Sequence, residues 1–153
     1  MGLFFLLLGG IMAVRPGINL RVYGVLRSQD SENILFIDET IMGKRLFKFP
    51  GGGVEHNEGP AQALIREFRE ELAVEISVGS LVYVSPNFHL SFFRPQQLIS
   101  LYWEVNLLKG QPQSQLPNLN LVWRPLKELK ITEMTHPVDQ EVVSELLARC
   151  GGK

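Results

Sequence analysis

The chain has 153 residues, a length typical of one domain. Hydrophobic residues make up 45% of it and charged residues 20%, so it can form a buried core and is not expected to be disordered. Because 15 lysines and arginines are balanced by 16 aspartates and glutamates, we expect no broad basic surface for nucleic acid. The single cysteine, Cys150, excludes an intrachain disulfide and a cysteine-based metal site, and it is compatible with a reducing cytoplasm.

The apolar stretch at residues 3–14 carries no targeting signal that we can identify. It is shorter than the roughly 17–25 residues that span a bilayer, and no basic residues precede it as in a signal peptide. Leu6 occupies the place where a myristoylation signal has serine or threonine. We therefore predict no membrane partner and a cytoplasmic protein. The stretch could be a buried strand, lie upstream of a start at Met12, or form the contact of a homodimer, which is the expected assembly.

The predicted elements alternate between short strands and two helices. Residues 20–26 and 34–37 are rich in β-branched and aromatic residues and flank a polar stretch, so they are predicted to form a hairpin. Residues 46–49 form a further strand that Pro50 and three glycines end in a loop. Pro60 suits the first position of a helix over residues 60–72. The remaining prediction is of strands at 74–84, 98–108 and 121–124 and a helix at 138–148. This mixture predicts an α/β or α+β fold, with helices covering a mixed sheet in a single domain over residues 1–153.

Three glutamates of the first helix indicate a metal site. Glu67, Glu70 and Glu71 are spaced i, i+3, i+4 and fall on one helix face, where like charges repel. A divalent cation would reverse that repulsion, since Mg²⁺ and Mn²⁺ prefer oxygen ligands and commonly share them with substrate phosphates. A solvated acidic face is the alternative. The glycines at 51–53, where backbone can approach a ligand closely, and the nearby acid Glu58 favour the metal site.

Residues 52–74 resemble the Nudix box, G-x5-E-x7-R-E-U-x-E-E-x-G-U, in which U is apolar. The matching residues are Gly52, Glu58, Arg66, Glu67, Phe68, Glu70, Glu71 and Val74. Ala73 stands where the family usually has glycine, a change that we expect to affect helix termination more than metal binding. The resemblance to Nudix hydrolases implies an α/β/α sandwich with a mixed sheet.

The same resemblance implies the roles of the box residues. The Mg²⁺ or Mn²⁺ ligands would be the Gly51 carbonyl, Glu67, Glu70 and Glu71. Arg66 would hold Glu67 through an ion pair, and Glu58 would brace the loop or assist metal binding. Glu67, Glu70 and Arg66 would be catalytic in the hydrolysis of a nucleoside diphosphate linked to another group, in which the metal neutralises phosphate charge and activates water.

The sequence offers several candidates for the general base. Many MutT-type members carry a further acid on a loop before a strand with tryptophan, but residues 116–123 contain asparagines and no carboxylate. Glu67, or a water held by the helix carboxylates, is therefore the expected base. Glu104 and Glu128 are alternatives.

Substrate choice in the family is set outside the box. The proline typical of ADP-ribose hydrolases and the tyrosine typical of diadenosine polyphosphate hydrolases are replaced here by His89 and Leu90. The chain is instead similar to MutT-type nucleoside triphosphate hydrolases and RNA pyrophosphohydrolases, which cleave between the α- and β-phosphates. We expect a substrate such as dGTP or the 5′-triphosphate end of RNA. An NDP-sugar hydrolase is the alternative, and a non-catalytic nucleotide sensor is a weaker one, because the box keeps all its carboxylates.

Further residues are candidates for substrate contacts. Phe88 could stack on a base and Arg94 could meet a phosphate, although the neighbouring Phe92 and Phe93 could equally be core residues. The remaining candidates, which precede or belong to the box, are Arg45, Lys48, Gly52 and Glu58.

Overall fold

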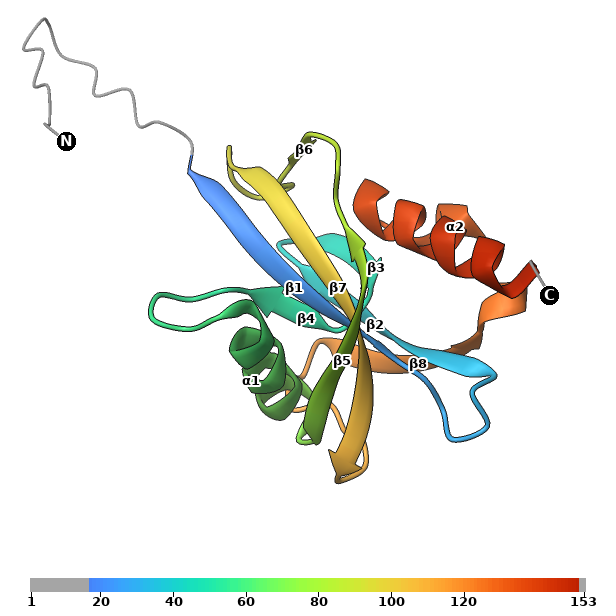
Figure 1. Ribbon diagram of the computed structural model, residues 1–153. Helices are drawn as coiled ribbons and strands as arrows, with labels where there is room; N and C mark the ends of the chain where they lie inside the picture. Colours follow the sequence, from blue (N-terminus) through green and yellow to red (C-terminus); the bar gives the residue numbers. More distant parts are fainter. Residues whose placement is uncertain (1–16, 152–153) are drawn as a thin grey trace, which may run out of the picture.

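The computed structural model describes residues 17–151, which form two β-sheets and two α-helices (Figure 1). The five-stranded sheet has the order β4-β1-β7-β5, with β6 paired to β7. It contains β1 (Ile18–Leu26), β4 (Gly51–Gly53), β5 (Glu75–Val84), β6 (His89–Leu90) and β7 (Gln97–Lys109). β1 and β7 are parallel and the other pairs are antiparallel, so this sheet is mixed. The second sheet has the order β3-β2-β8, with β2 (Asn33–Ile41), β3 (Lys44–Lys48) and β8 (Leu119–Pro125), all antiparallel.

The two helices cover different sides of the sheets (Figure 1). Helix α1 (Pro60–Leu72) packs against β1, β4 and β5, and its buried side chains include Leu64, Phe68 and Leu72. Helix α2 (Pro137–Gly151) follows two 3-10 turns, Leu126–Glu128 and Ile131–Glu133. It packs on a second hydrophobic core, separate from the one under α1. Consecutive strand residues point to opposite faces, so Val22 of β1 belongs to the core under α1 and Tyr23 to the core under α2. Both cores draw on both sheets.

The fold class is confirmed as α+β, but the predicted hairpin between residues 20–26 and 34–37 is wrong. β1 pairs with β4 and β7, whereas β2 pairs with β3 and β8. An isolated bridge joins Arg27, directly after β1, to Ile34 of β2, where the chain passes between the sheets. The glycines predicted as a loop form the short strand β4, and β6 was not predicted. The apolar residues 3–14 lie outside the described residues.

The ends of α1 follow from its sequence. Pro60 occupies the first turn, and the Gly59 N–H donates a hydrogen bond to Gln62 Oε1 at 2.7 Å. At the other end Ala73 adopts a left-handed conformation, φ 54°, and its N–H bonds to the Arg69 carbonyl at 3.1 Å. The residue that replaces the family's glycine is thus the left-handed cap of the helix. Between residues 17 and 151, no helix is long and apolar enough to cross a membrane.

Candidate active site

A cavity of about 430 Å³ opens beside α1, between β4 and the strands of the smaller sheet. Two predicted metal ligands of the helix, Glu67 and Glu71, line it together with Lys48. The other lining residues are Arg21, Glu39, Thr40, Ile41, Gly51, Gly52, Gly53, Leu116, Pro117, Asn118 and Leu119. Residues from five separate parts of the chain therefore surround the carboxylates of the box.

Two glycines of β4 bring its backbone close to its neighbours. A Cβ at Gly52 would collide with the Glu67 carboxylate, which would have to move from its present position. Gly51 has φ +141°, and a Cβ on it would collide with the Val22 carbonyl of β1. The Gly-Gly sequence thus places the box helix directly against the backbone of β4.

Arg66 joins the carboxylates of the box. Its guanidinium donates to Glu58 Oε1 at 2.6 Å and Oε2 at 3.0 Å, to Glu67 Oε1 at 3.0 Å and to Glu70 Oε2 at 3.2 Å. It also donates to the Gly53 carbonyl at 3.0 Å. The bidentate contact with Glu58 raises the pKa of Arg66 and lowers that of Glu58. These contacts tie helix, loop and strand together.

Glu71 is the most perturbed carboxylate of the box. Burial raises its pKa to about 7, and the neighbouring charges of Glu67 and Glu39 add to this effect, whereas that of Lys48 opposes it. Its Oε2 is buried without a hydrogen-bond partner. A buried carboxylate oxygen without a partner is costly unless something positive binds it, so this position suits a cation.

The described residues fit a hard divalent cation only after a rearrangement of side chains. Between residues 17 and 151, no three His, Cys, Asp or Glu side chains are grouped so that they could hold a metal ion. Arg66 bonds to both Glu67 and Glu70, so these carboxylates would have to leave Arg66, at least in part, to bind a cation together with Glu71. The Glu70 side chain is 60% exposed and therefore free to turn. The all-oxygen set of Glu67, Glu70, Glu71 and the Gly51 carbonyl suits Mg²⁺ or Mn²⁺.

Glu39 is a cavity residue that sequence reasoning missed. It lies on β2, is 7% exposed, and its Oε1 is 2.7 Å from the Nζ of Lys48 on β3. Lys48 is 4% exposed, and the ion pair with Glu39 and the charges of Tyr23 and Glu71 raise its pKa against the opposing effect of burial. Residues 36–39 are two apolar residues followed by two acids, so nothing in the local pattern distinguished the buried Glu39 from Asp38.

A second, smaller cavity of about 60 Å³ is lined in part by Tyr23. The phenol of Tyr23 accepts a hydrogen bond from Arg21 Nε at 2.8 Å, which connects the two cavities because Arg21 lines the first. Phe92 and His136 stack here with their ring centroids 4.8 Å apart. Burial, with the charges of Lys48 and Arg21, lowers the pKa of His136 to about 4, so this ring is neutral at pH 7.

Asp139 lies at the start of α2, next to this second cavity. It is completely buried, and its Oδ1 accepts a hydrogen bond from the Tyr102 hydroxyl at 2.7 Å, while Oδ2 has no partner. Burial raises its pKa to about 7 against the opposing effects of Tyr102, Lys48 and Arg21.

Some predicted substrate contacts lie elsewhere. Arg45 bonds to Asp38 at 2.6 Å, on the opposite face of the smaller sheet from Glu39. Phe88 is 67% exposed and Arg94 is exposed, and neither lines the two cavities. Their contacts with substrate remain predictions that the geometry does not favour.

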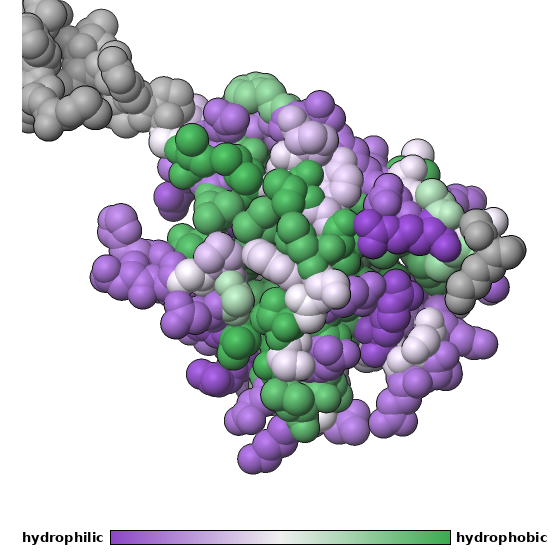
Figure 2. Space-filling view, viewed as in Figure 1, coloured by the Kyte–Doolittle hydropathy of each residue, from purple (hydrophilic) through white to green (hydrophobic). Residues whose placement is uncertain are grey.

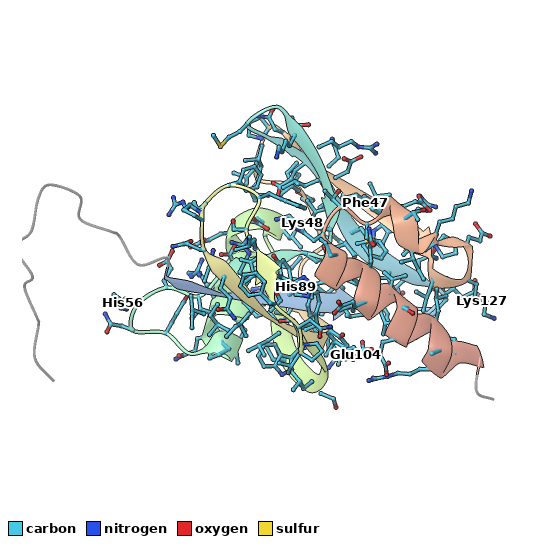
Figure 3. The ribbon with its side chains drawn as sticks, turned by 90° about the horizontal axis from the view of Figure 1, so that it is seen from above. Phe47, Lys48, His56, His89, Glu104 and Lys127 are labelled. Atoms are coloured by element: carbon cyan, nitrogen blue, oxygen red, sulfur yellow. The ribbon has the colours of Figure 1, made fainter. Side chains whose placement is uncertain are left out.

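The two alternative bases are also remote from the box. Glu104 pairs with Arg27 at 3.2 Å in a separate cavity of about 790 Å³. Glu128 lines another depression, beside Lys127. Figure 3 shows Glu104 and Lys127 well apart from Lys48. The carboxylates that line the cavity beside α1 are therefore Glu39, Glu67 and Glu71.

Comparisons with known proteins agree with this geometry. The model of the NUDIX domain family matches residues 18–146. The chain is 34% identical over 73 residues to an 8-oxo-dGTP diphosphatase of Proteus vulgaris and 35% identical over 51 residues to an RNA pyrophosphohydrolase of Saccharophagus degradans. These alignments cover 42% and 33% of this chain, and 65% and 29% of the two relatives, less than two thirds of either. A MutT protein from Methanosarcina mazei Go1 has a similar fold, with a TM-score of 0.72 at 17% identity over 92% of this chain and 100% of that one.

Proposed function

Because this chain belongs to the NUDIX family, we propose that it is a metal-dependent pyrophosphohydrolase of nucleoside 5′-triphosphates. Water would add to phosphorus, the anhydride bond between the α- and β-phosphates would break, and a nucleoside monophosphate and pyrophosphate would leave. The observation that carries the proposal is the cavity in which Glu67 and Glu71 of the box face the buried ammonium of Lys48. Carboxylates for a cation on one wall and an ammonium on another form a receptor for a phosphate chain with its metal.

Each box residue has a task in this reaction. Glu67, Glu70, Glu71 and the Gly51 carbonyl would hold Mg²⁺ or Mn²⁺, which when bound neutralises phosphate charge and makes water more acidic. Glu67 would accept the proton of the attacking water. Arg66, fixed by Glu58 and the Gly53 carbonyl, would orient Glu67 through the contact at 3.0 Å. Lys48 and Arg21 would compensate the phosphate charge on the side of the cavity that carries no metal ligand.

The preferred substrate in this proposal is a free (d)NTP such as dGTP, and a 5′-triphosphate end of RNA is the second choice. The names of the Proteus and Saccharophagus relatives support these two classes. The near-neutral chain favours small nucleotides, although an RNA end needs few phosphate contacts. The stacked Phe92 and His136 offer an aromatic surface for the base beside the second cavity.

A product assay over a panel of substrates tests this function. Purified protein with Mg²⁺ or Mn²⁺ is incubated with dNTPs, NDP-sugars, ADP-ribose and triphosphorylated RNA, and the phosphorus products are identified. We expect pyrophosphate from a triphosphate substrate and no turnover after chelation of the metal. Release of a sugar phosphate instead would identify an NDP-sugar hydrolase. Binding without any product would identify a sensor, and full activity with chelator would contradict the metal dependence.

We further propose that residues 1–153 act as one domain, in a cytoplasmic homodimer joined through the apolar residues 3–14. The free, exposed thiol of Cys150 is compatible with a reducing compartment. Light scattering at micromolar concentration should give the mass of a dimer. A monomeric mass would contradict the assembly without affecting the proposed reaction.

A further inference from the structure

The pair Glu39–Lys48 stands out among the ion pairs of the described residues because both side chains are almost fully buried. Their side chains are 8% and 5% exposed, whereas Arg45 in the pair on the opposite face of the same two strands is 74% exposed. Ile37 is the registered partner of Lys48 across β2 and β3, and Glu39 follows it by two residues on the same face. That face is the one turned toward the cavity of α1.

Stability alone does not account for this pair. Removing two opposite charges from water costs several kcal/mol per ion, and apolar residues of similar size are often as stabilising or more so. The ammonium has three donors, and its ion-pair contact among residues 17–151 is the one with Glu39 Oε1 at 2.7 Å. A buried ammonium with unused donors beside a cavity is poised to bind an anion or another acceptor.

Lys48 shares the cavity with two carboxylates, Glu39 and Glu71, and the charge of each acts on it. Glu71 Oε2 and Glu39 Oε1 are both buried without a hydrogen-bond partner, although Glu39 Oε1 lies 2.7 Å from the Nζ of Lys48 in the ion pair. A lysine side chain has four flexible bonds, so without an anchor on β2 its ammonium would be free to turn toward Glu71. Such a contact would neutralise a carboxylate that the metal needs and would remove the cation from the wall opposite α1.

We propose that Glu39 is a positioning residue that fixes the ammonium of Lys48 for the substrate's phosphate chain and keeps it away from Glu71. Lys48 then binds phosphate oxygens and leaves the box carboxylates available to the metal. The inference rests on the proposed function only in naming the anion as a phosphate chain. The arrangement of charges on the cavity walls stands independently of that function.

The proposal is tested with Glu39→Gln, Lys48→Met and the double variant. The matched control is Asp38→Asn. It removes the carboxylate of the residue directly before Glu39 on β2, which lies on the opposite face of the sheet. Nucleotide binding is measured by calorimetry with Mg²⁺ and α,β-methylene dGTP, in which the bond proposed to be cleaved is replaced by a stable carbon bridge. Mn²⁺ binding to the nucleotide-free protein is measured by electron paramagnetic resonance. Because Lys48→Met alone leaves Glu39 buried and unpaired, urea unfolding of each variant accompanies these measurements.

If Glu39 acts through Lys48, Glu39→Gln and Lys48→Met should each weaken binding of the analogue by about tenfold or more, the usual loss for a charge-assisted contact. In the Lys48→Met background the further change Glu39→Gln should have little effect. Glu39→Gln should also weaken Mn²⁺ binding, because the released ammonium competes for Glu71, and the double variant should recover wild-type Mn²⁺ affinity. Asp38→Asn should behave as wild type in both measurements.

Two results would overturn the proposal. An equal loss of nucleotide affinity from Glu39→Gln in both backgrounds would show that Glu39 does not act through Lys48. Weak Mn²⁺ binding that persists in the double variant would make Glu39 a metal ligand itself. Since Mn²⁺ binding needs no nucleotide, this outcome is separate from failure of the proposed function, which would appear as no hydrolysis of any substrate by the wild-type protein.

Discussion

Replacing Asp139 by asparagine should make the protein more stable at high pH and change its response to pH. A free aspartic acid has a pKa of 3.8, whereas burial raises that of Asp139 to about 7, so the folded protein binds this proton more tightly than the unfolded chain. Stability from this group is therefore lost as the pH rises from about 4 to 7. At about 1.4 kcal/mol for each tenfold change in proton affinity, ionisation of Asp139 in the folded protein costs about 4 kcal/mol at pH 8. At pH 5 Asp139 stays protonated in the folded protein, and ionisation in the unfolded chain lowers stability by less than about 2 kcal/mol.

The assay is urea unfolding of wild type and Asp139→Asn between pH 5 and 8, with chelator present throughout. The new amide keeps an acceptor for the Tyr102 hydroxyl, but the buried position of Oδ2 offers its N–H groups no partner, which costs about 1–3 kcal/mol at every pH. The informative quantity is therefore how the difference in unfolding free energy between variant and wild type changes with pH. Between pH 5 and 8 the unfolding free energy of the variant should increase by a few kcal/mol relative to that of wild type. The control is exposed Asp30, whose pKa is lowered by the Ser28 hydroxyl, so Asp30→Asn should not gain on wild type. A difference for Asp139→Asn that stays constant with pH would refute the reasoning.

Three substitutions probe the box and its helix. Glu70→Gln should lower turnover by about 10²–10³ while the protein still folds, because a charge leaves a repulsive cluster, and Glu75→Gln just outside the box should stay active in the same product assay. Gly52→Ala should abolish activity and weaken Mn²⁺ binding, because its Cβ would displace the adjacent box carboxylate, whereas Gly151→Ala, with nothing near its added Cβ, should not. Ala73→Gly should raise the free energy of unfolding by about 0.5–1 kcal/mol without changing turnover, since glycine relieves the left-handed cap; an unchanged or lower urea midpoint would contradict this.

Local signals in the sequence were sufficient for α1. Pro60 at the first turn and the apolar spacing of Leu64, Phe68 and Leu72 define a helix whose bounds agree with residues 60–72. Each of these signals acts over one or two turns, so it is visible without knowledge of the rest of the fold. The box carboxylates follow directly, because their placement on one face depends only on the helix itself.

Pairing between strands could not be predicted in the same way. The polar residues 28–33 look like the turn of a hairpin, yet β1 runs parallel to β7, some eighty residues later, and β2 pairs with β8. Strand partners are decided by which faces can be buried together, and here both faces of each sheet contribute to a core. The same uncertainty hid Asp139, whose burial depends on Tyr102 of β7 and on the way α2 closes over the sheets.

The position of Glu39 shows how a carboxylate reaches the cavity beside α1 from a strand next to residues 116–123. The stretch at residues 116–123 contains no carboxylate, but the antiparallel register of β2 and β8 places Glu39 opposite Leu119. Adjacent strands lie about 5 Å apart, so a side chain on β2 can reach the same space as one on the neighbouring segment. A carboxylate that residues 116–123 lack can thus come from β2, the neighbouring strand, and the pairing register is needed to see this. In this chain the supplied carboxylate comes with a lysine bound to it, so the cavity acquires an anchored cation rather than another free acid.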